Sequence, residues 1–563
     1  MKRHVKNGRT RAVLTGAILI SLAAAPAWAQ QVPGSVAPGR IEQQFQGAPT
    51  VAPPTGAPVT PRGLPPAEAP PGAEQVHFVL QRVQIDGATV FRPSDFAPLY
   101  QDLIGKDVTL ARMYQVAAAI TAQYGNAGYI LSQALVPAQQ INGGVVRLQI
   151  VEGYVAKVTF RNDSGGPVDD GLLAAYGAKI ARSQPLTAHD LERYLLLMND
   201  LPGVSARALM QASATPGAAD LVVVIDRKPY DALIGFDNRG NRFIGPYQAT
   251  GSFSLNDLIG RDDRTGLRFI NTVPLKDLHY GEISHDEPIF AEGTKLGIGA
   301  FYSDVHPGGS LNGLHDKDYS IWFQATHPFI RSRGENLSLR ARFEISSFDA
   351  KLGSTLVSSD DLRVLRLQLA YDRVDTFWLT AGNQAALELS QGIGVAGART
   401  QNARPGTSPT FTKVAATVSR DQPLFDHVSM VLASAGQYSR DVVPVSELFG
   451  FGGTEFGRGY DFSEIVGDSG LAGKAELRYT EIVSGGHLQA WQPYAFFDAG
   501  VVWNNFAFLT AKRQTATSTG VGVRATFDHN ISGYVELGVP LTRKVAAEND
   551  KSPRGFFGVQ MRF

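Results

Sequence analysis

Cysteine is absent from this chain of 563 residues. Its absence excludes disulfide bonds, thiolate metal sites and cysteine nucleophiles. It also removes the residue to which the lipid of a lipoprotein is attached. The length of the chain implies several domains.

Long apolar runs are missing as well. After the N-terminal segment no stretch offers about 18 uninterrupted apolar residues, which excludes membrane-spanning helices. Hydrophobic residues still make up 44% of the chain, and a β-barrel is the other way to cross a bilayer because its strands satisfy one another's backbone hydrogen bonds. An excess of basic charge is also lacking, since 52 Lys and Arg balance 52 Asp and Glu. We therefore expect no nucleic-acid partner.

The first 29 residues have the pattern of a secretory signal peptide. Basic residues precede an apolar run of about 14 residues, and Ala27-Trp28-Ala29 supplies a cleavage site after Ala29. The run is too short for a membrane anchor, which needs about 20 apolar residues. Cleavage would remove five basic and no acidic residues, leaving 47 basic against 52 acidic and a net charge of −5. The mature chain is expected to leave the cytoplasm.

Residues 30–76 are rich in Pro, Gly and Ala. Such a composition buries no core and predicts a linker with polyproline character. One short piece, residues 39–46, has the composition of one or two helical turns.

Two units with the same order of elements follow, at an interval of about 75 residues. In the first we expect strands at 78–85, 129–136 and 145–151 and helices at 93–103 and 110–124. In the second we expect strands at 155–160, 204–210 and 221–225 and helices at 171–176 and 188–198. Thr109 and Thr187 are predicted N-caps of the second helix of each unit.

From residue 229 onward the pattern changes to period two. Leu365, Leu367 and Leu369, for example, alternate with Arg366 and Gln368, which puts one face of a strand apolar and the other polar. About 335 residues of such segments, with almost no helical pattern, favour a transmembrane barrel with a polar lumen. At about 21 residues per strand and connection, the segment accommodates roughly 16 strands.

Three motifs of the first unit are similar to one known domain. They are Gly105-Lys106-Asp107-Val108-Thr109-Leu110, Tyr124-Gly125-Asn126-Ala127-Gly128-Tyr129-Ile130 and Val136-Pro137-Ala138-Gln139-Gln140, and Val151-Glu152-Gly153 closes the unit. The unit resembles the first POTRA domain of two-partner secretion transporters, the haemolysin-activation and filamentous-haemagglutinin-transporter type. Residues 191–204 resemble the second POTRA domain of the same family.

The barrel segment carries two further motifs that resemble this family. Phe449-Gly450-Phe451-Gly452-Gly453, followed by Arg458-Gly459-Tyr460, is similar to a long extracellular loop that folds back into the lumen. Phe496-Phe497-Asp498-Ala499-Gly500 is similar to a barrel-wall motif whose aspartate meets the arginine of that loop. The period of two independently places Asp498 on the lumen side. The last residue, Phe563, is the predicted C-terminal assembly signal of the barrel.

The resemblance implies a fold class and a domain order. The fold is a transmembrane β-barrel of about 16 antiparallel strands, preceded by two periplasmic α+β POTRA domains. The expected segments are a signal peptide (1–29), a linker with a possible short plug helix (30–76), POTRA 1 (77–152), POTRA 2 (153–228) and the barrel (229–563). The chain would lie in the bacterial outer membrane, with its POTRA domains in the periplasm.

The resemblance also implies a function. The POTRA pair would recognise a secreted partner exoprotein with an N-terminal secretion domain, and that protein would thread through the barrel. Outer-membrane lipid and the barrel-assembly machinery are further expected partners. An insertase that folds other barrels and a passive porin-like channel remain as alternatives.

Enzymatic motifs are weak, so we predict no catalytic residues, no cofactor and no metal site. Residues 392–397 match G-x-G-x-x-G but lead into a loop without a helix, which disfavours nucleotide binding. Gly467-Asp468-Ser469-Gly470 has the letters of a serine-protease nucleophile, yet it lacks the His and Asp context and is more typical of a turn. The eleven His residues show no H-E-x-x-H or comparable ligand spacing.

Overall fold

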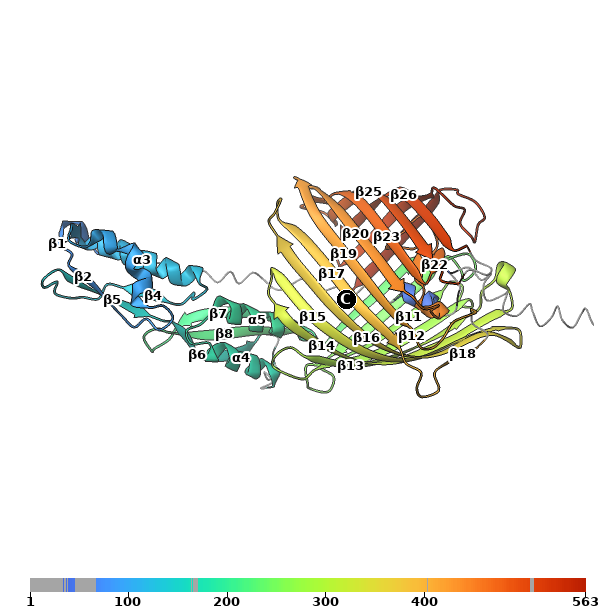
Figure 1. Cartoon of the computed structure of the whole chain (residues 1–563), viewed down its shortest axis with the longest axis horizontal. Helices are drawn as coiled ribbons and strands as arrows, with labels where there is room; N and C mark the ends of the chain where they lie inside the picture. The colour runs from blue at the N-terminus through green and yellow to red at the C-terminus, as the bar shows by residue number, and fades with distance from the viewer. Residues whose placement is uncertain are drawn as a thin grey trace, which may run out of the picture.

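The computed structural model describes residues 34, 37, 39–45, 67–163, 165, 171–401, 404–506 and 511–563. The predicted signal peptide and most of the predicted linker lie outside these residues. Two small α+β units follow one another at one end of a large barrel (Figure 1). We call the rim that carries them the near rim and the opposite one the far rim.

The first unit packs one long helix against a three-stranded sheet. The sheet has the order β2-β5-β4, with β2 and β5 parallel, and a separate pair joins β1 and β3. Thr109 caps the helix by accepting a hydrogen bond from the backbone N–H of Arg112. The elements are η3 (Ala73–Gln75), β1 (His77–Val79), β2 (Arg82–Asp86), η4 (Pro93–Leu99), η5 (Gln101–Leu103), β3 (Asp107–Thr109), α3 (Leu110–Asn126), β4 (Gln133–Leu135) and β5 (Val145–Val151).

Three expected elements of this unit differ in detail. The strand expected at 78–85 is split into β1 and β2, because the N–H groups of Gln81 and Arg82 bond to Gly144 instead of continuing the β1 ladder. The expected helix at 93–103 is two 3₁₀ pieces, the first of which contains Pro98, whose ring lacks an N–H donor. The strand expected at 129–136 is reduced to three residues.

The second unit repeats the plan with two helices on a sheet of order β6-β8-β7. Its core is made of buried apolar residues from both helices and from all three strands. Thr187 accepts from the N–H of Asp190 and so caps the second helix. The elements are β6 (Tyr154–Asn162), α4 (Leu172–Arg182), α5 (Ala188–Asn199), β7 (Val204–Ala212) and β8 (Ala218–Arg227).

The barrel closes on 16 long antiparallel strands, as the sequence predicts, with β18 (Arg399–Gln401) and β24 (Glu481–Ile482) as short side pieces. The first and last long strands join in register from Gly558↔Asp237 to Arg562↔Leu233. The long strands are β9 (Tyr230–Asp237), β10 (Gln248–Asn256), β11 (Arg264–Thr272), β12 (Leu278–Pro288), β13 (Lys295–Val305), β14 (Leu314–Arg331), β15 (Glu335–Leu352), β16 (Thr355–Asp375), β17 (Ala381–Gly392), β19 (Thr412–Phe425), β20 (Val428–Ser439), β23 (Ser469–Tyr479), β25 (Leu488–Trp503), β26 (Arg513–Phe527), β27 (Ile531–Pro540) and β28 (Arg554–Arg562).

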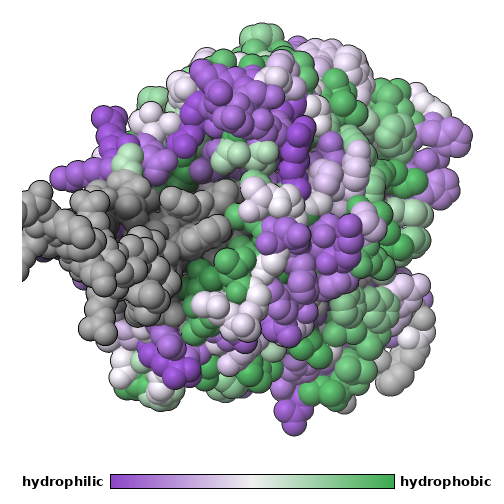
Figure 2. Space-filling view, turned by 90° about the vertical axis from the view of Figure 1, so that its right-hand side faces the viewer, coloured by the Kyte–Doolittle hydropathy of each residue, from purple (hydrophilic) through white to green (hydrophobic). Residues whose placement is uncertain are grey.

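The two faces of the barrel wall differ in polarity. Leu365, Leu367 and Leu369 point outward and are 39–41% exposed, whereas their neighbour Arg366 points inward to Glu447. Seen from the far rim, hydrophilic residues form broad areas and hydrophobic residues gather toward the right and lower edges (Figure 2). None of the helices in the described ranges has both the length and the hydropathy of a membrane span.

Candidate functional site

The connection between β20 and β23 folds from the far rim into the lumen. It contains η7 (Val445–Glu447) and a hairpin of β21 (Phe449–Phe451) and β22 (Ile465–Gly467), paired in the register Phe449↔Gly467. Buried Phe451, Tyr460 and Ile465 pack against wall residues Ala472, Val502 and Ala516 in one apolar cluster. We call residues 440–468 the lumen loop.

At the tip of the lumen loop, Arg458 forms an ion pair with Asp498 of β25. The Arg458 Nη2 lies 2.9 Å from Asp498 Oδ1, and its Nε lies 3.1 Å from Oδ2. The backbone N–H groups of Gly457 and Arg458 donate to the same Oδ2 at 3.1 and 2.9 Å. Both side chains are buried. The carboxylate therefore holds the guanidinium and the backbone of the tip at once, with the charge-assisted geometry of strong hydrogen bonds.

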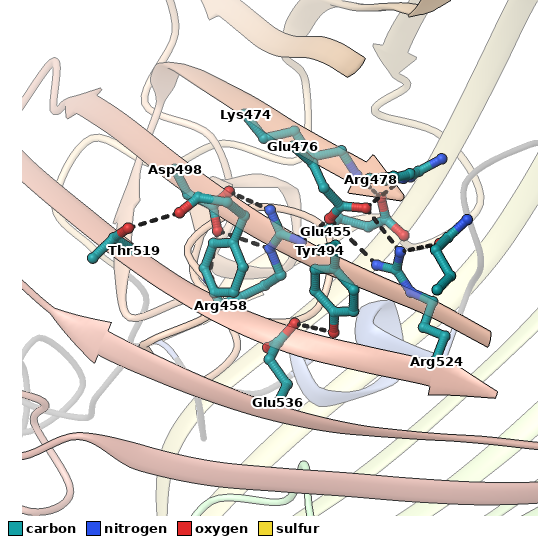
Figure 3. A network of polar contacts seen from close by, with 12 residues as sticks. Glu455, Arg458, Lys474, Glu476, Arg478, Tyr494, Asp498, Thr519, Arg524 and Glu536 are labelled. Atoms are coloured by element: carbon teal, nitrogen blue, oxygen red, sulfur yellow. Dashed lines mark hydrogen bonds and ion pairs between the residues drawn. The ribbon is translucent and has the colours of Figure 1, made fainter. Parts of the chain in front are cut away.

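The same guanidinium reaches a second carboxylate, Glu476 of β23. Arg458 Nη1 donates to Glu476 Oε2, and Arg478 and Arg524 both donate to Glu476 Oε1, at 2.6 and 2.8 Å. Figure 3 shows the guanidinium of Arg458 between Asp498 and Glu476. Glu476 and Arg478 come from β23 and Arg524 from β26. Removing one partner of such a buried network costs about 3–5 kcal/mol, because a charge is left without compensation.

An aromatic ring also contacts the guanidinium of Arg458. The Cζ of Arg458 lies 3.7 Å from the ring centroid of Phe496, two residues before Asp498 on the same strand. A planar guanidinium can stack on this ring and bond both carboxylates, which a lysine ammonium cannot do.

Gly459 and Tyr460, which follow Arg458, bring the tip against β26 and β27. A Cβ at Gly459 would meet Ser518 Cβ at 2.9 Å and the backbone around Pro540 at 3.0 Å. The Tyr460 hydroxyl donates to the carbonyl of Thr517 at 3.0 Å. The small residue thus permits the approach, and the tyrosine ties it to the wall.

The base of the loop is held by ion pairs that the sequence reasoning did not find. Asp468 is bonded by Arg404 at 3.0 and 3.1 Å, and Glu447 pairs with Arg366 and Lys413 at 2.6 Å each. The motif at 467–470 is not the expected turn, because Gly467 ends β22, Ser469 begins β23, and Asp468 is the single residue between the two strands. Only the polarity of these positions hinted at the pairs, because the partners are 34 to 81 residues away.

The short predicted helical piece of the linker lies inside the barrel. Residues Ile41–Gln44 form the 3₁₀ turn η2. Arg40 Nη2 donates to Ser463 Oγ at 2.6 Å, and the backbone N–H of Gly39 donates to Asp318 of β14 at 3.0 Å. The carbonyl of Phe45 accepts from Arg268 of β11 at 2.7 Å. The segment 39–45 thus bridges the lumen loop and the opposite wall.

Phe563 lies at the seam between the last and first strands. Its N–H donates to the Ala232 carbonyl at 2.9 Å, and its own backbone oxygen accepts from Lys228 Nζ at 2.8 Å. Its side chain is 43% exposed.

The second unit is fastened to the near rim by charged side chains. Arg331, at the end of β14, contacts both carboxylate oxygens of Asp200 at 2.6 and 2.7 Å. Lys295, at the start of β13, donates to the Asp200 carbonyl at 2.7 Å. A Cβ at Gly293 would meet Leu197 at 2.5 Å, so the turn between β12 and β13 presses against α5.

One domain family and one protein family match parts of this chain. Residues 78–153 match the POTRA domain of ShlB type, and residues 312–525 match the haemolysin secretion/activation protein family ShlB/FhaC/HecB. Both matches fall on elements described above: the first α+β unit, and the wall from β14 to β26 with the lumen loop.

Individual relatives cover more of the chain. The heme/hemopexin transporter protein HuxB of Haemophilus influenzae is 22% identical over 470 residues, covering 80% of this chain and 81% of HuxB. With HuxB of strain 86-028NP the identity is 26% over 277 residues, and the chain spans about half (48%) of that relative's length. The outer membrane transporter CdiB of Dickeya dadantii is 23% identical over 74% of this chain and 73% of its own. The solved structure of CdiB from Escherichia coli has the same fold, with a TM-score of 0.71 at 19% identity over 98% of this chain and 100% of that one.

Proposed function

Because the chain belongs to the ShlB/FhaC/HecB family of two-partner secretion transporters, we propose that it moves one large partner exoprotein across the outer membrane. It is a transporter and not an enzyme. The observation that carries the proposal is the lumen loop, pinned to the barrel wall by Arg458 and Asp498 at 2.9 Å. The two α+β units add the contrast with a passive pore, which would not need peptide-binding units beside its barrel.

Two segments occupy the lumen: the lumen loop, which belongs to the barrel between β20 and β23, and residues 39–45, which precede the first α+β unit. The lumen loop is fixed by buried ion pairs at Asp468, Glu447 and Arg458. The segment 39–45 adds one short 3₁₀ turn and hydrogen bonds to the loop and to the wall. We assign this segment as the plug that leaves, and the loop as the element that guides the substrate past the wall.

The two α+β units are assigned as a pair of periplasmic POTRA domains, residues 77–152 and 153–228. Their common order of elements supports this assignment for the second unit. Each sheet has edges, and in the second unit β7 borders only β8 among the described strands. Leu209 and Met210 on β7 are 48% and 39% exposed. Such an edge can accept an extended peptide as an added strand, with its exposed apolar side chains as contacts.

The secretion domain at the N-terminus of the partner is the proposed peptide. No nucleotide drives the transfer in this scheme, because the periplasm supplies none. Folding of the passenger outside the cell would pull the chain through. A passenger that cannot fold externally should therefore stall in the pore, and its complete release would contradict this source of energy.

The location follows from the family and the barrel. The chain is an outer-membrane protein, and its outward apolar face is assigned to outer-membrane lipid. Phe563 is assigned as the signal that the barrel-assembly machinery reads, and the signal peptide 1–29 as its route of export.

Secretion and the insertase alternative can be separated in one experiment. The chain is co-expressed with a large secreted protein encoded beside its gene, and passenger in the medium is measured with and without residues 77–228. Release that requires the chain and these residues, while other outer-membrane proteins assemble normally, supports dedicated secretion. Unchanged release with failed assembly of other barrels would support an insertase.

A further inference from the structure

Three side chains with metal-binding chemistry converge on the outer face of the barrel at the far rim. The Asp304 Oδ1 lies 2.7 Å from His315 Nε2 and 3.5 Å from His306 Nδ1. One donor atom from each residue lies within 4.8 Å of the others. The two imidazole rings are stacked, with centroids 4.1 Å apart and planes inclined by 21°.

The β13–β14 hairpin builds this cluster. Asp304 is the penultimate residue of β13, His306 follows the strand, and His315 is the second residue of β14. The backbone N–H of His306 donates to the Asp277 carbonyl at 2.8 Å, which anchors its position to the neighbouring loop. The spacing of the histidines predicted no metal site, because the hairpin register that joins them is not visible in the sequence.

The cluster faces the medium beyond the membrane. Tyr302 and Tyr319 are opposite each other in the register of β13 and β14 and are 48% and 49% exposed. Asp304 lies two residues further toward the far rim on the same face of its strand. Aromatic residues of this kind mark the membrane–water interface of outer-membrane barrels. The Asp304 cluster is therefore within reach of ions from outside the cell.

The arrangement differs from an ordinary surface ion pair. Lys317 lies directly opposite Asp304 in the register. Yet within the described part of the chain the ion pairs of Asp304 are those with the two imidazoles. Two imidazole nitrogens and one carboxylate oxygen that face one another form a set of ligands for a cation.

We propose that Asp304, His306 and His315 bind a divalent transition-metal ion of the zinc class. Two imidazole nitrogens and one carboxylate oxygen are the protein ligands of an open tetrahedral site, whose fourth position is left to water or to a ligand from the medium. The ion would join the end of β13 to the start of β14 and so brace the hairpin at the far rim.

Zinc titration of the purified full-length barrel in detergent, prepared without a polyhistidine tag, tests this site. The comparison is between the wild-type chain, Asp304→Asn, the double variant His306→Ala/His315→Ala, and a control. The control, His285→Ala/His327→Ala, removes two imidazoles that bond to Thr265 and Thr294 instead.

We expect one tight Zn²⁺ per chain in the wild type and in the control. The double variant should lose it, and Asp304→Asn should bind more than about tenfold more weakly. The proposal is overturned if the wild type binds no Zn²⁺, or if the double variant keeps the same number of ions at the same affinity. Substitution by Co²⁺ in the wild-type chain gives a test without any variant. Intense tetrahedral absorption bands support the site, and the weak bands of the hydrated ion would refute it.

Discussion

Arg458 donates three hydrogen bonds to the carboxylate of Asp498, two from its guanidinium and one from its own backbone N–H. The pair therefore fixes the side chain and the backbone of the loop tip together. Since the wall strand β25 is held on both sides by long ladders, loss of the pair should release the loop before it unfolds the barrel.

Arg458→Lys tests the demand for a guanidinium. The ammonium keeps the charge but loses the double contact with Asp498 and the stacking on Phe496. We expect reduced export of the partner protein with a normally assembled barrel, measured as passenger in the medium against barrel mobility in unheated gels. Arg333→Lys is a matched control, because Arg333 is a half-buried arginine whose nearest carboxylate, on Glu192, is 3.8 Å away. Full export by Arg458→Lys would show that charge alone suffices.

Reversal of both charges should restore export only in part. Arg458→Asp and Asp498→Arg should each abolish export, because each leaves a buried charge without its partner, which destabilises the folded state by about 3–5 kcal/mol. In the double variant the new aspartate faces Glu476, and the N–H groups of Gly457 and residue 458 face an arginine. Passenger release should therefore rise above that of either single variant without reaching the wild-type level. A double variant no better than the worse single one would count against direct pairing.

Gly500→Ala should disturb the packing of the lumen loop against the barrel wall. The added Cβ would lie 2.2 Å from the ring of Phe451, in the loop hairpin. Export should fall, and Phe451→Leu in the same chain should recover part of it by removing the ring. Gly473→Ala is the control, since its Cβ would meet its nearest neighbour, the Ala433 carbonyl, at 3.8 Å. Equal export by the two alanine variants would show that the contact is not needed.

Asp200→Asn should loosen the second unit from the near rim. Two charged contacts with Arg331 are then weakened, at a site where both groups are largely buried. We expect faster hydrogen exchange in residues 196–203 and lower export, with the barrel unchanged. Asp226→Asn, which weakens an exposed contact with Arg207, should alter neither. Unchanged hydrogen exchange in Asp200→Asn would show that other contacts hold the second unit to the near rim.

Acid should destabilise the first unit through Glu152. Burial raises the pKa of this carboxyl, but hydrogen bonds from Thr89, Val90 and Tyr124 outweigh burial and hold the pKa below its ordinary value of 4.5. A depressed pKa in the folded state contributes stability above pH 4.5, and this contribution is lost as the pH falls through the folded value. The protection of the amides of residues 89–90 against hydrogen exchange, taken relative to the intrinsic rate at each pH, should fall below pH 4.5 in the wild type. In Glu152→Gln this protection should be low already at pH 7, and high protection there would contradict the role of the carboxylate.

The sequence was sufficient for what depends on local pattern. Period two and chain length predicted the 16 strands, Thr109 and Thr187 predicted two helix starts, and alternation around Asp498 predicted its lumen side. Contacts that depend on the register between strands could not be predicted from the sequence. Glu476 meets Arg458 because β23 and β25 pair with Lys474 opposite Asp498, and nothing local in the sequence specifies that register. The same holds for the Asp304 cluster.

A cysteine lock tests most directly whether the partner protein passes through the lumen. The chain has no cysteine, so Gly39→Cys/Ser446→Cys introduces a single pair. A Cβ on residue 39 would lie 2.7 Å from Ser446 Cβ and 2.7 Å from the ring of Phe348, so residue 39 must move outward to reach the roughly 3.5–4.5 Å of a disulfide, and the single variants measure the effect of that shift alone. The measurement is passenger in the medium before and after reduction, beside each single variant. Our account predicts that the oxidised double variant holds segment 39–45 in the lumen and blocks export, and that reductant restores it. Export at the level of the single variants while the disulfide is intact would contradict passage through this lumen.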